Sequence, residues 1–132
     1  MRKMVLFVLA AAVSLVVLGA CSKGYESQKN TGGIIITLKS DRYPLVLGDN
    51  TMTVKVADAA GKVVTDARVE VRFYMPPMPG MAPMETTTAA APSGDKYAFT
   101  ANAAMAGGWK ADVTVTPPSK PGVSTTFNLD AR

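Results

Sequence analysis

Four methionines recur at every third residue of one proline-rich stretch, at Met75, Met78, Met81 and Met84. Thioethers are soft, uncharged donors that suit Cu(I) and offer little to Mg²⁺, Ca²⁺ or Zn²⁺. A proline-rich segment favours polyproline II, whose three residues per turn would place all four sulfurs on one side, about 9 Å apart. One metal would then require a bend, and a Pro-Gly pair between Met78 and Met81 is a candidate. The stretch therefore predicts a Cu(I) site in which Met75 or Met84 adds a third donor.

Two other interpretations of this stretch stay open. Met75 continues the inward phase of the preceding strand, and Met is a common filler of irregular core gaps, so the loop would then only cover one end of the fold. Flexible Met side chains also repack against different shapes, which makes a protein-docking module the alternative to copper binding. Met105, in a glycine-containing loop, is a further candidate donor, whereas Met52 lies on an inward strand phase and is expected in the core.

The sequence lacks the residues that most catalytic and metal-binding sites require. The chain contains no His and one Cys, so the usual nucleophile and base pairs are missing, and so are the ligands of a tetrahedral zinc site. We therefore expect no enzymatic activity. The formal charge of +4 falls to +2 once Arg2 and Lys3 are removed with the leader, and the basic residues lie scattered along the chain. No nucleic-acid partner is expected.

The first twenty residues have the features of an export signal. Arg2 and Lys3 give a positive start, and an apolar run follows that is shorter than the roughly 20 residues of a spanning helix. The run ends in Leu-Gly-Ala before Cys21, which resembles the lipobox of bacterial lipoproteins. A retained transmembrane helix, or a buried or redox-active thiol at Cys21, are the alternatives. We expect residues 1–20 to be removed, Cys21 to be lipidated, and the protein to be attached to a membrane of the cell envelope, facing the periplasm or the exterior.

The mature chain divides into two parts. Residues 21–32 are polar, and we expect them to form a flexible tether after the lipidated Cys21. From Gly33 to Arg132 apolar residues alternate with polar ones at a period of two, which is typical of strands with one buried face. The pattern is clearest in residues 34–38, 51–56, 68–73, 96–100, 109–116 and 123–129, with weaker candidates at 43–47 and 84–91.

About seven short strands without a helix, in roughly 100 residues, predict an all-β, immunoglobulin-like β-sandwich over residues 33–132. Asp58 to Gly61 has the composition of a type I turn. Trp109 begins a strand on its inward phase, and we expect it to pack in the core.

A family resemblance is carried by four segments that occur in order: Gly61-Lys62-Val63-Val64-Thr65-Asp66-Ala67-Arg68-Val69, Met75-Pro76 through Met84, Tyr97, and Gly108-Trp109. In these the domain resembles the YtkA-like and FixH-like group, although Val63 stands where Pro is common in that group. The resemblance implies an extracytoplasmic β-sandwich, with relatives linked to copper-oxidase assembly or found beside heavy-metal efflux adaptors. The partner that the resemblance suggests is therefore an envelope protein of metal efflux or of oxidase assembly.

Overall fold

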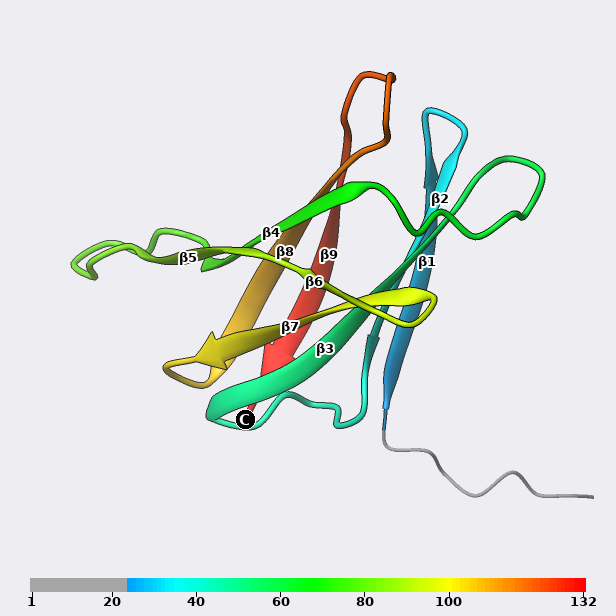
Figure 1. The fold of residues 1–132 in the computed structure, drawn as a ribbon. Helices are drawn as coiled ribbons and strands as arrows, with labels where there is room; N and C mark the ends of the chain where they lie inside the picture. Colours follow the sequence, from blue (N-terminus) through cyan, green and yellow to red (C-terminus); the bar gives the residue numbers. More distant parts are fainter. Residues whose placement is uncertain (1–23) are drawn as a thin grey trace, which may run out of the picture.

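The computed structural model describes residues 24–132, so the predicted signal segment and Cys21 lie outside the described residues. All regular structure in this part is β-strand (Figure 1). No helix in it has the length and hydropathy needed to cross a bilayer. The strands are β1 Tyr25–Thr31, β2 Ile34–Ser40, β3 Gly48–Ala57, β4 Arg68–Met75, β5 Met84–Ala89, β6 Ala91–Ser93, β7 Lys96–Ala103, β8 Gly107–Thr116 and β9 Val123–Ala131.

The strands form two antiparallel sheets that pack face to face. One sheet has the order β1-β2-β3-β7-β6, and the other has the order β5-β4-β8-β9. The chain builds β1 to β3 in the first sheet, crosses to β4 and β5, returns for β6 and β7, and ends with β8 and β9 in the second sheet. The predicted all-β, immunoglobulin-like sandwich is therefore confirmed.

The core lies between the sheets and follows the alternation in the sequence. Most long strands from β2 onward bury every second side chain, as in the fully alternating burial of Arg68–Met75, and β9 does so from Phe127 onward. Trp109 is buried as predicted, and its ring stacks on Phe73 with centroids 4.8 Å apart and planes 5° apart. Met52 is also buried in the core. The inward phases predicted for β4 and β8 thus place their apolar side chains correctly.

The prediction of a flexible tether over residues 21–32 is wrong for most of the residues that the structure describes in this range. Tyr25–Thr31 forms β1, which pairs with β2 along its whole length, from Tyr25 opposite Ser40 to Thr31 opposite Ile34. Its side chains are exposed or half-buried, so the strand needs no apolar alternation and is held by its backbone ladder. The Nζ atom of Lys29 also donates to the backbone oxygen of Thr126 on β9. The folded domain therefore begins about eight residues earlier than Gly33.

Two weak strand candidates also differ from the prediction. Residues 43–47 are not a strand, and only Leu45 forms an isolated parallel bridge to Ala131. The amide of Leu45 donates to Asp130 O at 2.8 Å, and the amide of Arg132 donates to Leu45 O at 2.9 Å. Residues 84–91 give two strands instead of one, because the chain leaves the β4 sheet after β5 and enters the β7 sheet at β6. These differences, together with β1, account for nine strands where about seven were expected.

Candidate metal site

Two of the four predicted ligands lie opposite each other at the base of the β4–β5 hairpin. Met75 ends β4, Met84 begins β5, and the two are direct partners in the antiparallel ladder. Side chains of direct partners lie on one face of a sheet, with Cβ atoms about 4.5–5.5 Å apart. Met75 is only 5% exposed, and Met84 is half-buried against the core. The strand pairing therefore brings these two thioethers together.

The other two predicted ligands flank a tight turn at the tip of the same hairpin. The amide of Met81 donates to the carbonyl oxygen of Met78 at 3.1 Å. Between them stand Pro79 and Gly80, and the φ of Gly80 is +80°, which is the pattern of a type II turn. The predicted bend is therefore present, and the four sulfurs do not lie along one extended stripe. Met78 is 42% exposed and Met81 is 40% exposed.

A hollow of about 290 Å³ lies between the first part of the hairpin loop and the start of β8, and neither Met81 nor Met84 is among its lining residues. Met75 and Met78 line it from the hairpin, and Gly107 and Gly108 line it from the start of β8. Gly107 has a φ of +139°, and a Cβ atom added there would lie 3.2 Å from the Cε atom of Met75. The sequence analysis named this region only as the glycine-containing loop of Met105 and as the Gly108-Trp109 segment of the family resemblance. Its position before a strand and near a second Met-containing loop was the available signal.

Met105, the further candidate donor, lies beside this region but is tied into the fold. It is partly buried against the core, and its backbone oxygen accepts a hydrogen bond from Trp109 Nε1 at 3.0 Å. The lining of the hollow includes the neighbouring Ala106 and not Met105. We therefore keep Met105 outside the candidate ligand set.

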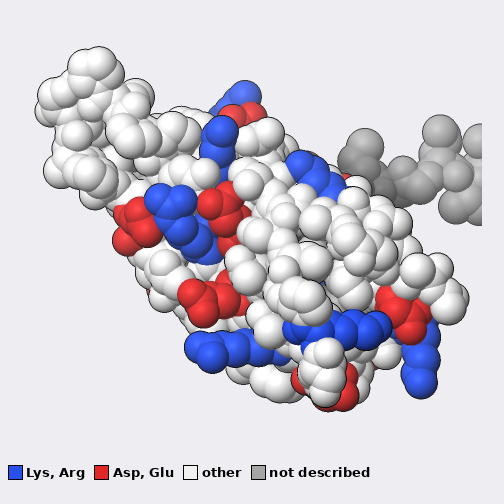
Figure 2. Space-filling view, turned by 90° about the horizontal axis from the view of Figure 1, so that it is seen from above, with Lys and Arg blue, Asp and Glu red and all other residues white. Residues whose placement is uncertain are grey.

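The hairpin loop carries no charged residue from Met75 to Met84. Figure 2 shows an uncharged lobe at the left, the side on which the β4–β5 loop protrudes in Figure 1. At the foot of the lobe Arg72 holds Glu85 through two contacts, Nε to Oε1 at 2.7 Å and Nη2 to Oε2 at 2.8 Å. Arg72 also pairs with Asp112 at 3.2 Å. Arg72, Glu85 and Asp112 are thus paired with each other on the outer face of the sheet.

The ion pair between Arg72 and Glu85 shifts the pKa of both groups. The hydrogen bond from Arg72, and then the guanidinium charge, hold the pKa of Glu85 below its ordinary value. Hydrogen bonding to Glu85, with a smaller part from Asp112, raises the pKa of Arg72. Both groups are exposed, so these shifts are screened by solvent. Among residues 24–132 no three His, Cys, Asp or Glu side chains gather in a way that would hold a metal ion. The thioether cluster is therefore the candidate metal site in this part of the chain.

A buried tyrosine fixes the long loop between β3 and β4. Tyr97 is 1% exposed; its hydroxyl accepts a hydrogen bond from the amide of Ala67 at 3.0 Å and donates one to Val64 O at 3.1 Å. The same loop begins with the predicted turn, in which Gly61 N donates to Asp58 O at 2.9 Å. The sequence motif around these residues therefore serves the fold, and it sets where β4 begins its run toward the methionine hairpin.

The fold and the site together define a small β-sandwich that presents a methionine-rich hairpin at one side. The YtkA-like family model matches residues 28–123, from within β1 to the start of β9. The chain therefore belongs to the YtkA-like family, and this part of the predicted resemblance is confirmed.

A comparison with solved structures finds the PmoD soluble domain from Methylocystis sp. ATCC 49242 (Rockwell). The similarity has 18% sequence identity and a TM-score of 0.47, and it covers 75% of this chain and 90% of that one. A comparison with curated proteins finds no match.

Proposed function

We propose that this YtkA-like protein is an exported lipoprotein, acylated on Cys21, that binds Cu(I) through the thioethers of its β4–β5 hairpin. The candidate ligands are Met75, Met78, Met81 and Met84. Its role is that of a non-enzymatic accessory protein of the cell envelope, which handles Cu(I) for an efflux or oxidase-assembly partner.

The observation that supports this proposal best is the hairpin geometry. Ladder pairing sets Met75 beside Met84, the turn sets Met78 beside Met81, and the hollow at Gly107 joins Met75 to Met78. Soft sulfur donors select Cu(I) over harder divalent ions. Because Met78 and Met81 are exposed and unbranched, their side chains can reorient toward a metal without unfolding the sandwich.

The test is a Cu(I) titration of the soluble fragment 22–132 in competition with a chelator. The fragment starts at Ser22 because β1 begins at Tyr25 and belongs to the domain. Replacing Met78, Met81 and Met84 by Leu conserves volume, so it should cost the fold less than about 1.5 kcal/mol per site. We expect the variant to lose most of its Cu(I) affinity while its unfolding midpoint stays close to that of the parent fragment.

Two controls sharpen the titration. Met52→Leu changes a thioether that is buried in the core on β3, outside the hairpin sequence, and should leave the Cu(I) affinity unchanged. The affinity of the parent fragment should also stay constant between about pH 5 and about pH 7, because thioethers do not titrate. Full affinity in the triple Leu variant, or no affinity in the parent fragment, would refute copper binding by this hairpin.

A docking module is the second candidate, favoured by the exposure of Met78 and Met81 on an uncharged lobe. Docking needs apolar bulk and not sulfur, so the triple Leu variant should keep partner binding, whereas Asp at Met78 and Met81 should abolish it. Crosslinking of the envelope-bound protein, compared between these two variants, separates docking from copper binding.

The lipid attachment is tested on the full chain. Cys21→Ser should leave the protein in the soluble fraction, whereas the parent protein should fractionate with membranes and carry an acylated Cys21 as its first residue. An unacylated Cys21 in the mature protein would contradict this part of the proposal.

A further inference from the structure

The end of the sandwich where the described chain begins has a defined set of neighbours. We name it the proximal end, formed by residues 24–25, the loop 41–47 and the C-terminal residues 131–132. A Cβ atom added at Gly24 would lie 2.9 Å from Ser40 O, and the rings of Tyr25 and Tyr43 lie 5.0 Å apart. Figure 1 shows these segments together at the bottom, opposite the β8–β9 loop. The chain therefore enters the domain at this end.

The chain between the lipidation site and the proximal end is very short. Three Cα–Cα steps join Cys21 to Gly24, and such a segment spans at most about 11 Å. β9 has nine residues and runs from the proximal end to the β8–β9 loop, a rise of about 27 Å. A lipid on Cys21 therefore keeps the proximal end at the bilayer surface, and it lets Lys120 in the β8–β9 loop stand well away from it.

The proximal end carries an apolar side chain that the fold does not use. Among the large apolar residues of the described chain, Leu47, Met78 and Met81 are exposed, and the two methionines belong to the β4–β5 hairpin. Leu47 is 54% exposed at the end of the loop 41–47. An apolar side chain held at a membrane surface gains free energy by entering the interface between headgroups and acyl chains.

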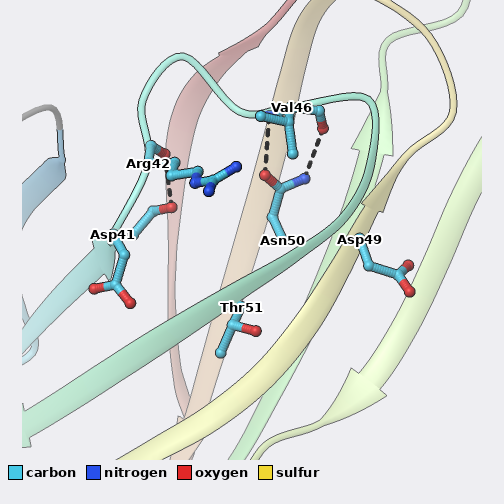
Figure 3. A pocket seen from close by; sticks show the side chains of 7 residues that line it. Asp41, Arg42, Val46, Asp49, Asn50 and Thr51 are labelled. Carbon is cyan, nitrogen blue, oxygen red and sulfur yellow. Dashed lines mark hydrogen bonds between the residues drawn. The ribbon is translucent and has the colours of Figure 1, made fainter.

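The backbone beside Leu47 is held in place by Asn50. The side chain of Asn50 accepts a hydrogen bond from Val46 N at 3.0 Å and donates one to Val46 O at 2.9 Å (Figure 3). Asn50 is itself buried, so Leu47 projects from a fixed turn. Around this turn a polar hollow includes Asp41, Arg42 and Asp49, which carry charges of both signs. Mixed charges suit zwitterionic phospholipid headgroups better than a strongly anionic surface.

From these observations we propose that the proximal end rests on zwitterionic phospholipid headgroups, with Leu47 in the membrane interface. This inference rests on the lipidation of Cys21 proposed above. It places the domain upright on its lipid, with the β8–β9 loop directed away from the membrane.

The test uses the full-length lipidated protein in phosphatidylcholine vesicles that contain a headgroup spin label. An environment-sensitive fluorophore is attached through Leu47→Cys in one variant and through Lys120→Cys in the other; acylation consumes the sulfur of Cys21. Both sites are exposed, so neither substitution disturbs the core. We expect several-fold stronger quenching and a blue-shifted emission at position 47, with little change when salt is raised.

Each outcome of this test is decisive. Equal quenching at positions 47 and 120 in protein that floats with the vesicles would overturn the orientation and leave the lipidation intact. Protein that fails to float, and so behaves like Cys21→Ser, would overturn the lipidation together with the orientation.

Discussion

Tyr97→Phe isolates the two hydrogen bonds that hold the β3–β4 loop on the sandwich. The substitution removes one oxygen from a side chain that is almost fully buried, and it leaves the ring in place. The amide of Ala67 and the carbonyl of Val64 both lose their partner. With a net value of about 0.5–1.5 kcal/mol for each hydrogen bond, the expected loss is about 2 kcal/mol of unfolding free energy. For a domain of this size that corresponds to about 8 °C in Tm.

Urea unfolding of the fragment 22–132, followed by the fluorescence of Trp109, measures this loss. The midpoint should fall while the slope with urea stays constant, because the same surface is exposed on unfolding. Tyr74→Phe is the matched control: the ring of Tyr74, and not its hydroxyl, faces the guanidinium of Arg72. A Tyr97→Phe variant as stable as Tyr74→Phe would refute the view that the hydroxyl fixes the loop.

Two further variants test the surroundings of the methionine hairpin. Gly107→Ala places a Cβ atom 3.2 Å from Met75 Cε at a φ of +139°, so it should lower the free energy of unfolding by about 1–3 kcal/mol and weaken Cu(I) binding. Gly108→Ala is the control, because a Cβ atom there would meet nothing within 4 Å, and it should change neither stability nor Cu(I) binding. Equal stabilities in denaturant would contradict this account. Arg72→Met should raise the pKa of Glu85 toward its ordinary value of 4.5, as read from an NMR titration of that carboxyl. Because the folded-state pKa of Glu85 is depressed, the ion pair stabilises the fold above pH 4.5, and this stabilisation is lost as pH falls through the folded-state pKa. The Arg72→Met variant should not show this loss of stability. An unchanged pKa of Glu85 in the variant would refute the role of Arg72.

The sequence pattern predicts the strands that bury one face and misses those that do not. β4 alternates fully, and its inward residues were identified from their period alone. β1 has no such period, since as an edge strand it buries little and is held by backbone pairing to β2. The prediction for residues 43–47 is wrong in the opposite direction, because a strand was expected there. Leu45 is buried, but its neighbours pair with no strand. Hydropathy reports burial and not backbone pairing, so it misses a paired strand that buries little and predicts a strand where a buried residue has unpaired neighbours.

The candidate site also combines features that a short sequence segment determines with contacts between residues far apart in the sequence. The bend between Met78 and Met81 follows from a Pro-Gly pair and was predictable, because turn geometry depends on the residues of the turn. The pairing of Met75 with Met84 depends on the hairpin register, and the contact of Met75 with Gly107 depends on β4 and β8 being neighbours. Neither contact is encoded in a short segment, so the position of Gly107 beside Met75 was not predicted from the sequence.

The sandwich contributes to the proposed Cu(I) site mainly by limiting the freedom of the loop. Met75 and Met84 close the hairpin as a ladder pair, so the loop 76–83 has both ends fixed on the β4 sheet. Four of the nine prolines of the chain lie in these eight residues, and each removes one backbone torsion from the free loop. A loop that is already restricted loses less conformational entropy when its side chains close on a ligand. The same residues in an unfolded peptide would therefore close on a metal ion at a greater entropic cost than they would in the paired hairpin.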